Sequence, residues 1–259
     1  MSDVMLLTGA GQIGMAIARR MGYGRKIVVG DKDQDQAEAA VEILNHAGFD
    51  SDWMEMDLSS RESILNFIKE AMRYGDISMF INAAGVSPSQ ASIETILKVD
   101  LYGTAALSPE IDEQLATCPT EQLLSLEVLQ PRNLRNTLHA YQMAKRCNEK
   151  RVMAEAVKWG VKGARINSIS PGIVVTPLAM DEFNGQRGEF YKTMFAKCPA
   201  GRPGTADEIA DVAGLLMSHQ GAFITGSDVL IDGGATASYF YGPLRPDGKK
   251  EADNLQNHC

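Results

Sequence analysis

Short apolar segments alternate with longer amphipathic segments along the first third of the chain. The apolar segments predict β-strands at VMLLT (4–8), KIVVG (26–30), DWMEM (52–56) and ISMFIN (77–82). The amphipathic stretches between them predict helices. Strands that alternate with helices usually pair in parallel and are covered on both faces. The pattern therefore predicts an α/β fold built on a doubly wound parallel sheet.

The second half of the chain continues this alternation. A long helix is expected through Tyr141 to Trp159, then a strand at ARINSIS (164–170), a helix at TADEIADVAGLLM (205–217) and a last strand at DVLID (228–232). Residues 242–259 are polar and predict a loose tail. A chain of 259 residues with 44% hydrophobic content can bury one core, so a single domain over residues 1–259 is expected.

Composition narrows the possible functions. The net charge of −8 argues against nucleic-acid binding, which depends on clustered Lys and Arg. No signal peptide or membrane-spanning run is visible, so a cytoplasmic protein without membrane association is expected. The cysteines and histidines are dispersed without metal-ligand spacing, which predicts reduced thiols and no metal site.

A glycine motif follows the first predicted strand. Gly9, Gly11 and Gly14 have the spacing G-x-G-x-x-G between a strand and a helix, where a pyrophosphate can approach the backbone. Asp31 ends the second predicted strand, where a carboxylate can bind an adenosine ribose and repel a 2′-phosphate. NAD is therefore favoured over NADP, although Lys32 leaves NADP open. A plain glycine turn and a methyltransferase using S-adenosylmethionine are the alternatives.

A second motif lies on the long predicted helix. Tyr141 and Lys145 are four residues apart in YQMAK, so both side chains lie on one helix face. This pair occurs often by chance, and its significance comes from the segments around it. These segments are INAAG (81–85), NSISPGIVVTPL (167–178), CPAGRPGTADEIADVAGLLM (198–217) and FITGSDVLIDGG (223–234).

With these motifs together, the chain resembles the short-chain dehydrogenase/reductase family from the glycine loop to Gly234. The resemblance implies a Rossmann fold with a seven-stranded sheet and a homodimer or homotetramer. It also implies hydride transfer between NAD(P) and a secondary alcohol or ketone, the activity of a short-chain alcohol dehydrogenase or carbonyl reductase. The methyltransferase alternative loses support, because that chemistry needs neither the tyrosine-lysine pair nor the proline-glycine strand end.

The resemblance also implies roles for individual residues. Tyr141 would be the acid or base, and Lys145 would lower its pKa and bind the nicotinamide ribose. Asp100 stands where the family usually has a proton-relaying asparagine, and an ionised carboxylate differs from that asparagine because it cannot donate a hydrogen bond. The expected cofactor contacts are Gly9, Gly11, Gln12, Ile13, Gly14, Asp31, Lys32, Asp57, Leu58, Asn82, Ala83, Ala84, Gly85, Tyr141, Lys145, Pro171, Gly172, Val174 and Thr176.

One expected element is missing from the sequence. The family usually carries a fifth strand that ends in a substrate-polarising serine, whereas LLSLEVL (123–129) suits an amphipathic helix better and SPEIDEQL (108–115) resembles a helix start. We hypothesise that a segment with this strand and serine has been lost between about Thr104 and Pro109, by omission from the recorded sequence rather than from the protein. Ser125 is the fallback polariser.

Two functional questions stay open at this level. A protein that truly lacks the serine could be a catalytically impaired cofactor-binding sensor or scaffold. Residues 178–201 are expected either to contact an apolar substrate or simply to pack as helices, and SYFYGPL (238–244) could form a subunit contact.

Overall fold

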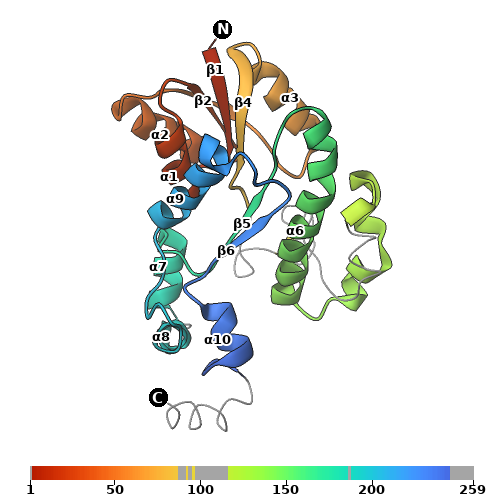
Figure 1. Cartoon of the computed structure of the whole chain (residues 1–259), viewed down its shortest axis with the longest axis vertical. Coiled ribbons are helices and arrows are strands. Elements are labelled where there is room, and N and C mark those ends of the chain that lie inside the picture. The colour runs from red at the N-terminus through yellow and green to blue at the C-terminus, as the bar shows by residue number, and fades with distance from the viewer. Residues whose placement is uncertain (1, 87–91, 93–94, 97–115, 186–187, 246–259) are drawn as a thin grey trace. The chain divides into compact units, whose positions relative to one another are not determined.

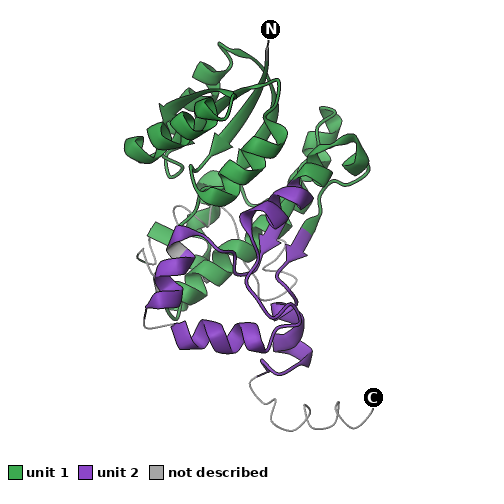
Figure 2. Ribbon diagram, turned by 90° about the vertical axis from the view of Figure 1, so that its left-hand side faces the viewer, with its two compact units in different colours: residues 1–168, 214–228 green, residues 169–213, 229–259 purple. Residues whose placement is uncertain are grey.

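A computed structural model describes residues 2–86, 92, 95–96, 116–185 and 188–245. The chain forms two compact units (Figure 2). Unit 1 comprises Met1–Ser168 and Gly214–Asp228, and unit 2 comprises Ile169–Ala213 and Val229–Cys259. The expectation of a single domain stays a prediction.

Unit 1 contains a parallel sheet with the strand order β3-β2-β1-β4. Its strands are β1 (Ser2–Thr8), β2 (Lys26–Asp31), β3 (Asp50–Glu55) and β4 (Gly75–Asn82). All four predicted strands are confirmed, and so is the parallel α/β fold. Thr8 pairs with Gly30 on one side and with Asn82 on the other. The carboxyl ends of these three strands therefore lie level at one edge of the sheet.

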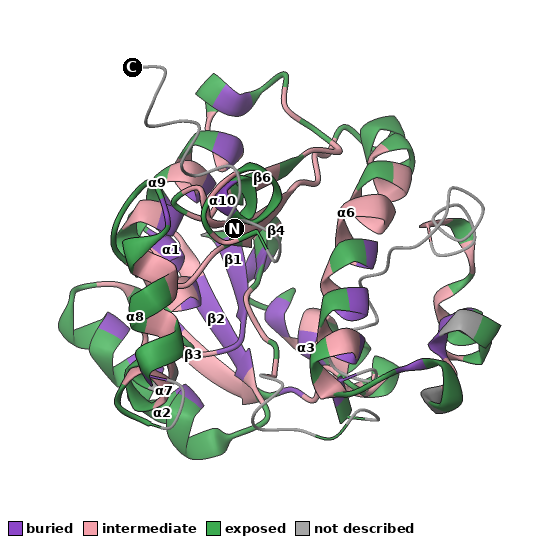
Figure 3. Cartoon of the chain, turned by 90° about the horizontal axis from the view of Figure 1, so that it is seen from below, coloured by how far each residue is buried: buried purple, intermediate pink, exposed green. Residues whose placement is uncertain are grey.

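Helices cover both faces of this sheet. The helices α1 (Gln12–Met21) and α2 (Gln34–His46) lie on one side, and α3 (Arg61–Ala71) lies on the other (Figures 1 and 3). Asp33 caps α2 by accepting from the Gln36 N–H, and Ser60 caps α3 by accepting from the Ser63 N–H. Burial between the helices explains why the middle of β2 is wholly apolar and buried.

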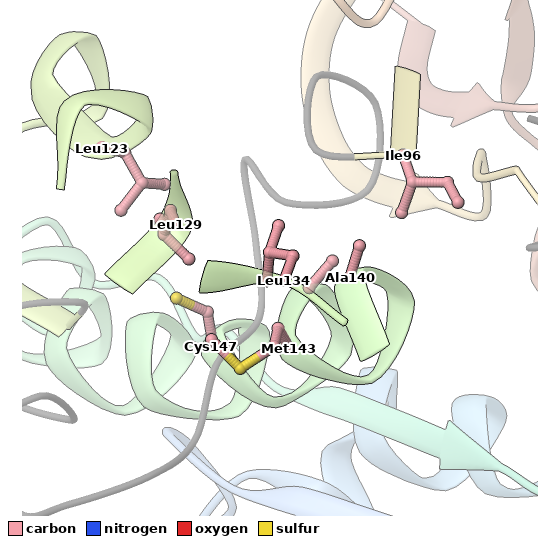
Figure 4. Close-up of a cluster of buried hydrophobic side chains, with 8 residues drawn as sticks. Ile96, Leu123, Leu129, Leu134, Ala140, Met143 and Cys147 are labelled. Atoms are coloured by element: carbon pink, nitrogen blue, oxygen red, sulfur yellow. The ribbon is translucent and has the colours of Figure 1, made fainter. Parts of the chain in front are cut away.

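The long helix α6 (Thr137–Val161) includes the predicted segment from Tyr141 to Trp159. Its buried side chains pack against a short helical region that contains the 3₁₀ helices η1 (Thr120–Ser125), η2 (Glu127–Leu129) and η3 (Pro131–Asn133) (Figure 4). The segment LLSLEVL lies in η1 and η2, with Leu123 and Leu129 buried. The expectation that this segment is not a strand is confirmed. The expectation of an amphipathic α-helix is wrong, because the segment forms two 3₁₀ helices.

The remaining strands form a separate sheet. Strand β5 (Ser168–Pro171) pairs with β6 (Asp228–Ile231), and these two strands are not joined to the four-stranded sheet. The described residues thus contain six strands in two sheets, where the family pattern implies seven in one. The interval from Thr104 to Pro109, the segment SPEIDEQL and Asp100 lie outside the described residues.

Unit 2 is mainly helical. Its helices are α7 (Pro177–Asn184), α8 (Gly188–Ala196), most of α9 (Ala206–Met217) and α10 (Ala235–Tyr241), and η4 (His219–Gly221) follows α9. The Phe183 ring of α7 packs edge to face against the rings of Tyr191 and Phe195 of α8. Contact of this segment with a substrate stays a prediction. Residues 246–259 of the expected tail lie outside the described residues. Among the helices described, none is both long and apolar enough to cross a bilayer.

Candidate functional site

The glycine loop joins β1 to α1 at the carboxyl edge of the sheet. Gly9 has φ +86°, a left-handed conformation that favours glycine, and its N–H donates to the Gly30 carbonyl at 2.9 Å. A Cβ added at Gly9 would lie 2.7 Å from the backbone of Ala84. The loop after β4 therefore sits directly against the glycine loop, and only glycine fits between them.

The other two glycines serve different purposes. A Cβ at Gly14 would lie 2.8 Å from Leu7 Cδ1 and 2.9 Å from Ala83 Cβ, so Gly14 allows α1 to approach the sheet. A Cβ at Gly11 would meet nothing within 4 Å, so open space lies above this residue. Gly11 is also the N-cap of α1 and makes no side-chain capping bond.

Open space above a helix N-terminus suits a phosphate. The N–H groups of the first turn, at Gln12 and Ile13, have no partner within the helix. The positive end of the helix dipole adds to the attraction for an anion. These residues, with Gly9, Gly11 and Gly14, fit the pyrophosphate of a dinucleotide.

Asp31 lies next to the glycine loop and braces it. Its Oδ2 atom accepts from the Ala10 N–H at 2.8 Å, and its Oδ1 atom accepts from the Asp33 N–H at 3.0 Å. An ionised carboxylate offers about four acceptor positions, so Asp31 keeps capacity for ribose hydroxyls. The sequence predicted a ribose-binding role for Asp31 but did not reveal its hydrogen bond with the glycine loop.

Lys32 and Asp57 form an ion pair beside Asp31, with Lys32 Nζ 2.7 Å from Asp57 Oδ2. The hydrogen bond from Lys32 and those from Ser59 lower the pKa of Asp57 to about 2. Leu58 is partly buried and packs against a core cluster that includes Met56. The sequence predicted Asp57 and Leu58 as cofactor contacts but did not reveal the ion pair or the contribution of Ser59.

The next four predicted residues lie at the end of β4 and in the loop that follows it. Thr8 Oγ1 donates to Asn82 Oδ1 at 2.7 Å, and the Ala83 N–H donates to the Thr8 carbonyl at 2.9 Å. These bonds fix the start of the loop, and Ala84 then contacts the glycine loop. Gly85 is exposed. Thr8 was not predicted, although a polar residue at the end of an apolar strand, just before the first glycine, was a usable signal.

Tyr141 and Lys145 lie on the same face of α6, as the four-residue spacing predicted. The Lys145 Nζ atom lies 5.1 Å from the centre of the Tyr141 ring. Tyr141 is partly buried against the cluster of α6 and the 3₁₀ helices. The Lys145 ammonium therefore lies over the Tyr141 ring in a cation–π contact.

Four predicted residues lie at and after the end of β5 in unit 2, where Pro171 is the last residue of the strand. A Cβ at Gly172 would lie 2.6 Å from the Asp232 Cα, so glycine lets the ends of β5 and β6 meet. Val174 is buried and bridges Gly204. Thr176 caps α7 by accepting from the Ala179 N–H. The binding role of these residues and of Pro171 stays a prediction.

The two remaining catalytic candidates gain no support. Asp100 lies outside the described residues. Ser125 lies in η1, where its hydroxyl donates to the Gln122 carbonyl at 2.6 Å. To polarise a substrate oxygen, Ser125 would have to break this bond.

Known proteins are similar in sequence to most of this chain. Residues 9–236 match a family model described as enoyl-(acyl carrier protein) reductase. The chain is 31% identical to the short-chain dehydrogenase/reductase bsc3 of Alternaria brassicicola, over 91% of this chain and 96% of that protein. It is 30% identical to D-threitol dehydrogenase of Mycolicibacterium smegmatis, over 90% and 92% of the two chains.

Solved structures share the fold. The crystal structure of gox2181 has a TM-score of 0.71 and 22% identity, with 91% of this chain and 96% of that one covered. A structure of actinorhodin polyketide ketoreductase with NADPH has a TM-score of 0.67 and 22% identity, with 90% and 97% covered.

The alignment with the Alternaria protein also contains gaps in this chain. The alignment extends over 264 residues, more than the whole length of this chain, although it includes 91% of it. The relative therefore has positions within the aligned region that have no counterpart here.

Proposed function

The chain belongs to the short-chain dehydrogenase/reductase family, and on this basis we propose that it transfers a hydride between NAD and a secondary alcohol or ketone. The relatives named as dehydrogenases and reductases support an oxidoreductase with a nicotinamide cofactor. The residues of the proposed reaction are Tyr141 and Lys145, and their adjacency on α6 is the observation on which the proposal rests.

The glycine loop fits the dinucleotide that the family implies. The open space at Gly11, the uncapped start of α1 and the acceptor capacity of Asp31 would hold the pyrophosphate and the ribose. When bound, the nicotinamide ring supplies or accepts the hydride.

Tyr141 would carry the proton. In the reducing direction its hydroxyl donates a proton to the carbonyl oxygen, and in the oxidising direction the phenolate accepts the alcohol proton. The Lys145 ammonium stabilises that phenolate and hydrogen-bonds the nicotinamide ribose. Asp100 would take the place of the family's relay asparagine.

The charges around the ribose position favour NAD over NADP. The Asp31 carboxylate beside the glycine loop would repel a 2′-phosphate. The ketoreductase whose structure contains NADPH shares the fold of this chain. Binding of NADPH is therefore measured together with binding of NADH.

A second candidate function is a cofactor-binding sensor or scaffold with impaired turnover. Positions of the Alternaria relative that have no counterpart in this chain support a lost segment, which we place between about Thr104 and Pro109. A protein that truly lacks this segment would have impaired turnover. Without the serine expected there, one oxygen-polarising donor is gone, which costs about 10² to 10³ in rate.

One experiment separates the two candidates. NADH and NADPH binding is measured by fluorescence titration, and NADH oxidation is then measured with a panel of ketones and quinones. Binding with turnover supports the enzyme, and binding without turnover supports the sensor or scaffold. Absence of nucleotide binding contradicts both. Cytoplasmic location and a homodimer or homotetramer remain part of the proposal.

A further inference from the structure

Lys32 and Asp57 follow neighbouring strands at the edge where the nucleotide is proposed to bind. Lys32 comes directly after β2 and Asp57 comes shortly after β3, and the two strands pair in parallel with Asp31 opposite Glu55. This register brings the residues that follow β2 and those that follow β3 to the same edge of the sheet. The Lys32 ammonium donates to Asp57 Oδ2 at 2.7 Å.

Asp57 is the fixed partner of this pair. Its Oδ1 atom accepts from the Ser59 N–H at 2.9 Å and from Ser59 Oγ at 2.6 Å, and its own N–H donates to Ser63 Oγ at 2.9 Å. The Asp57 side chain is 30% exposed, whereas that of Lys32 is 71% exposed. The lysine therefore reaches across to a carboxylate whose position is already set.

The ion pair with Asp57 changes how the Lys32 charge would affect a 2′-phosphate. A free ammonium here would attract a 2′-phosphate and offset the repulsion from Asp31. The Lys32 ammonium is instead paired with the Asp57 carboxylate. Asp33 and Glu55 are nearby in sequence and add further negative charge at the ends of these strands.

We propose that Asp57 is a specificity-determining residue for the cofactor, because it holds the Lys32 ammonium and so keeps that charge from a 2′-phosphate. This inference rests on the proposed use of a nicotinamide dinucleotide. Asp57 is a positioning residue in this role, since it acts through Lys32.

The test is a cycle of variants in which NADH and NADPH dissociation constants are measured by fluorescence titration. Asp57→Asn keeps the size and the acceptor of Asp57 but removes its charge. It should raise NADPH affinity relative to NADH by about threefold to tenfold, a modest change because exposed ion pairs are weak. Asp57→Glu retains the charge and should keep the ratio close to that of the wild type.

The second arm removes the lysine. In a Lys32→Gln background, Asp57→Asn should change the ratio by less than about twofold, because the released ammonium is absent. A general structural effect would weaken both nucleotides and leave the ratio unchanged. An unchanged ratio in Asp57→Asn, or an equal gain without Lys32, overturns the inference. If no variant and no wild-type protein binds either nucleotide, the proposed function itself fails, and the inference fails with it.

Discussion

The Lys145 Nζ atom lies 5.1 Å from the centre of the Tyr141 ring, one turn further along α6. The four-residue spacing in a helix produces this contact without help from the rest of the fold. The surrounding cluster then fixes the ring, since Tyr141 packs against buried residues that include Met143 and Ala144. Chemistry at the phenol therefore depends both on local helical geometry and on the packing of α6.

Removal of the Lys145 charge should affect both binding and turnover. Lys145→Met should lower kcat by about 10² or more and also weaken NADH binding, because the ammonium is proposed to serve both the phenolate and the ribose. Steady-state kinetics and NADH titration measure the two effects separately.

Lys158→Met is the matched control on the same helix. Lys158 is exposed and pairs with Glu155, so its loss should cost at most about 1 kcal/mol in stability and leave kcat unchanged. Equal effects of the two variants on kcat would contradict the role of Lys145.

The glycine loop offers a pair of substitutions with different outcomes. Gly9→Ala should lower the free energy of unfolding by about 2 kcal/mol or more, because it combines a left-handed φ with overlap against Ala84. Gly11→Ala should fold normally but weaken NADH binding by about tenfold or more, because its methyl group enters the open space. Urea denaturation and NADH titration measure the two outcomes. Normal NADH binding by Gly11→Ala would show that the dinucleotide lies elsewhere.

The Lys32–Asp57 pair should stabilise the fold in a defined range of pH. The pKa of Asp57 in the folded chain, about 2, lies below its ordinary value, because Lys32 and Ser59 donate hydrogen bonds to it. Its contribution is therefore complete above about pH 4 and is lost as the pH falls toward 2. For this partly exposed pair we expect about 1 kcal/mol.

Urea denaturation at several pH values tests this contribution. The difference in free energy of unfolding between the wild type and Asp57→Asn should be constant from pH 7 to pH 5 and should shrink between pH 4 and pH 3. Asp76→Asn, at an exposed position near the start of β4, is the control and should have little effect at any pH. A difference that grows as the pH falls would contradict the assigned direction.

The proposed lost segment predicts the mass of the natural protein. If the strand and serine between about Thr104 and Pro109 were omitted from the recorded sequence, the protein isolated from its source should be heavier than 28.1 kDa. Intact-mass measurement with peptide mapping of this region checks the expectation. A mass of 28.1 kDa would show that the protein truly lacks the segment, and would favour the sensor or scaffold.

Much of the fold could be predicted because the pattern of burial is simple. The strands β1 and β2 are buried in unit 1 and therefore read as continuous apolar runs, and the glycine motif follows the first of them. The strand at 164–170 was predicted too long. The Arg165 side chain donates to carbonyls that include that of Gly221 in η4, the Asn167 side chain donates to the Ile224 carbonyl, and the strand begins only at Ser168.

The site was predictable where its residues are close in sequence. Tyr141 and Lys145 share a helix turn, and Gly9 to Gly14 form one loop. Lys32 and Asp57 are 25 residues apart, and Thr8 and Asn82 are 74 apart, so their contacts exist only after the strands pair. A local sequence pattern does not predict which lysine will form an ion pair with which carboxylate.

The central claim is that Tyr141 transfers the proton that accompanies hydride transfer. The most direct measurement is the oxidation of bound NADH in a single turnover, with a ketone or quinone from the panel, by the wild type and by Tyr141→Phe. Phenylalanine retains the ring that packs in the cluster, so both proteins should bind NADH alike, while the variant should react about 10² to 10⁴ times more slowly. Equal rates in the two proteins would contradict the account.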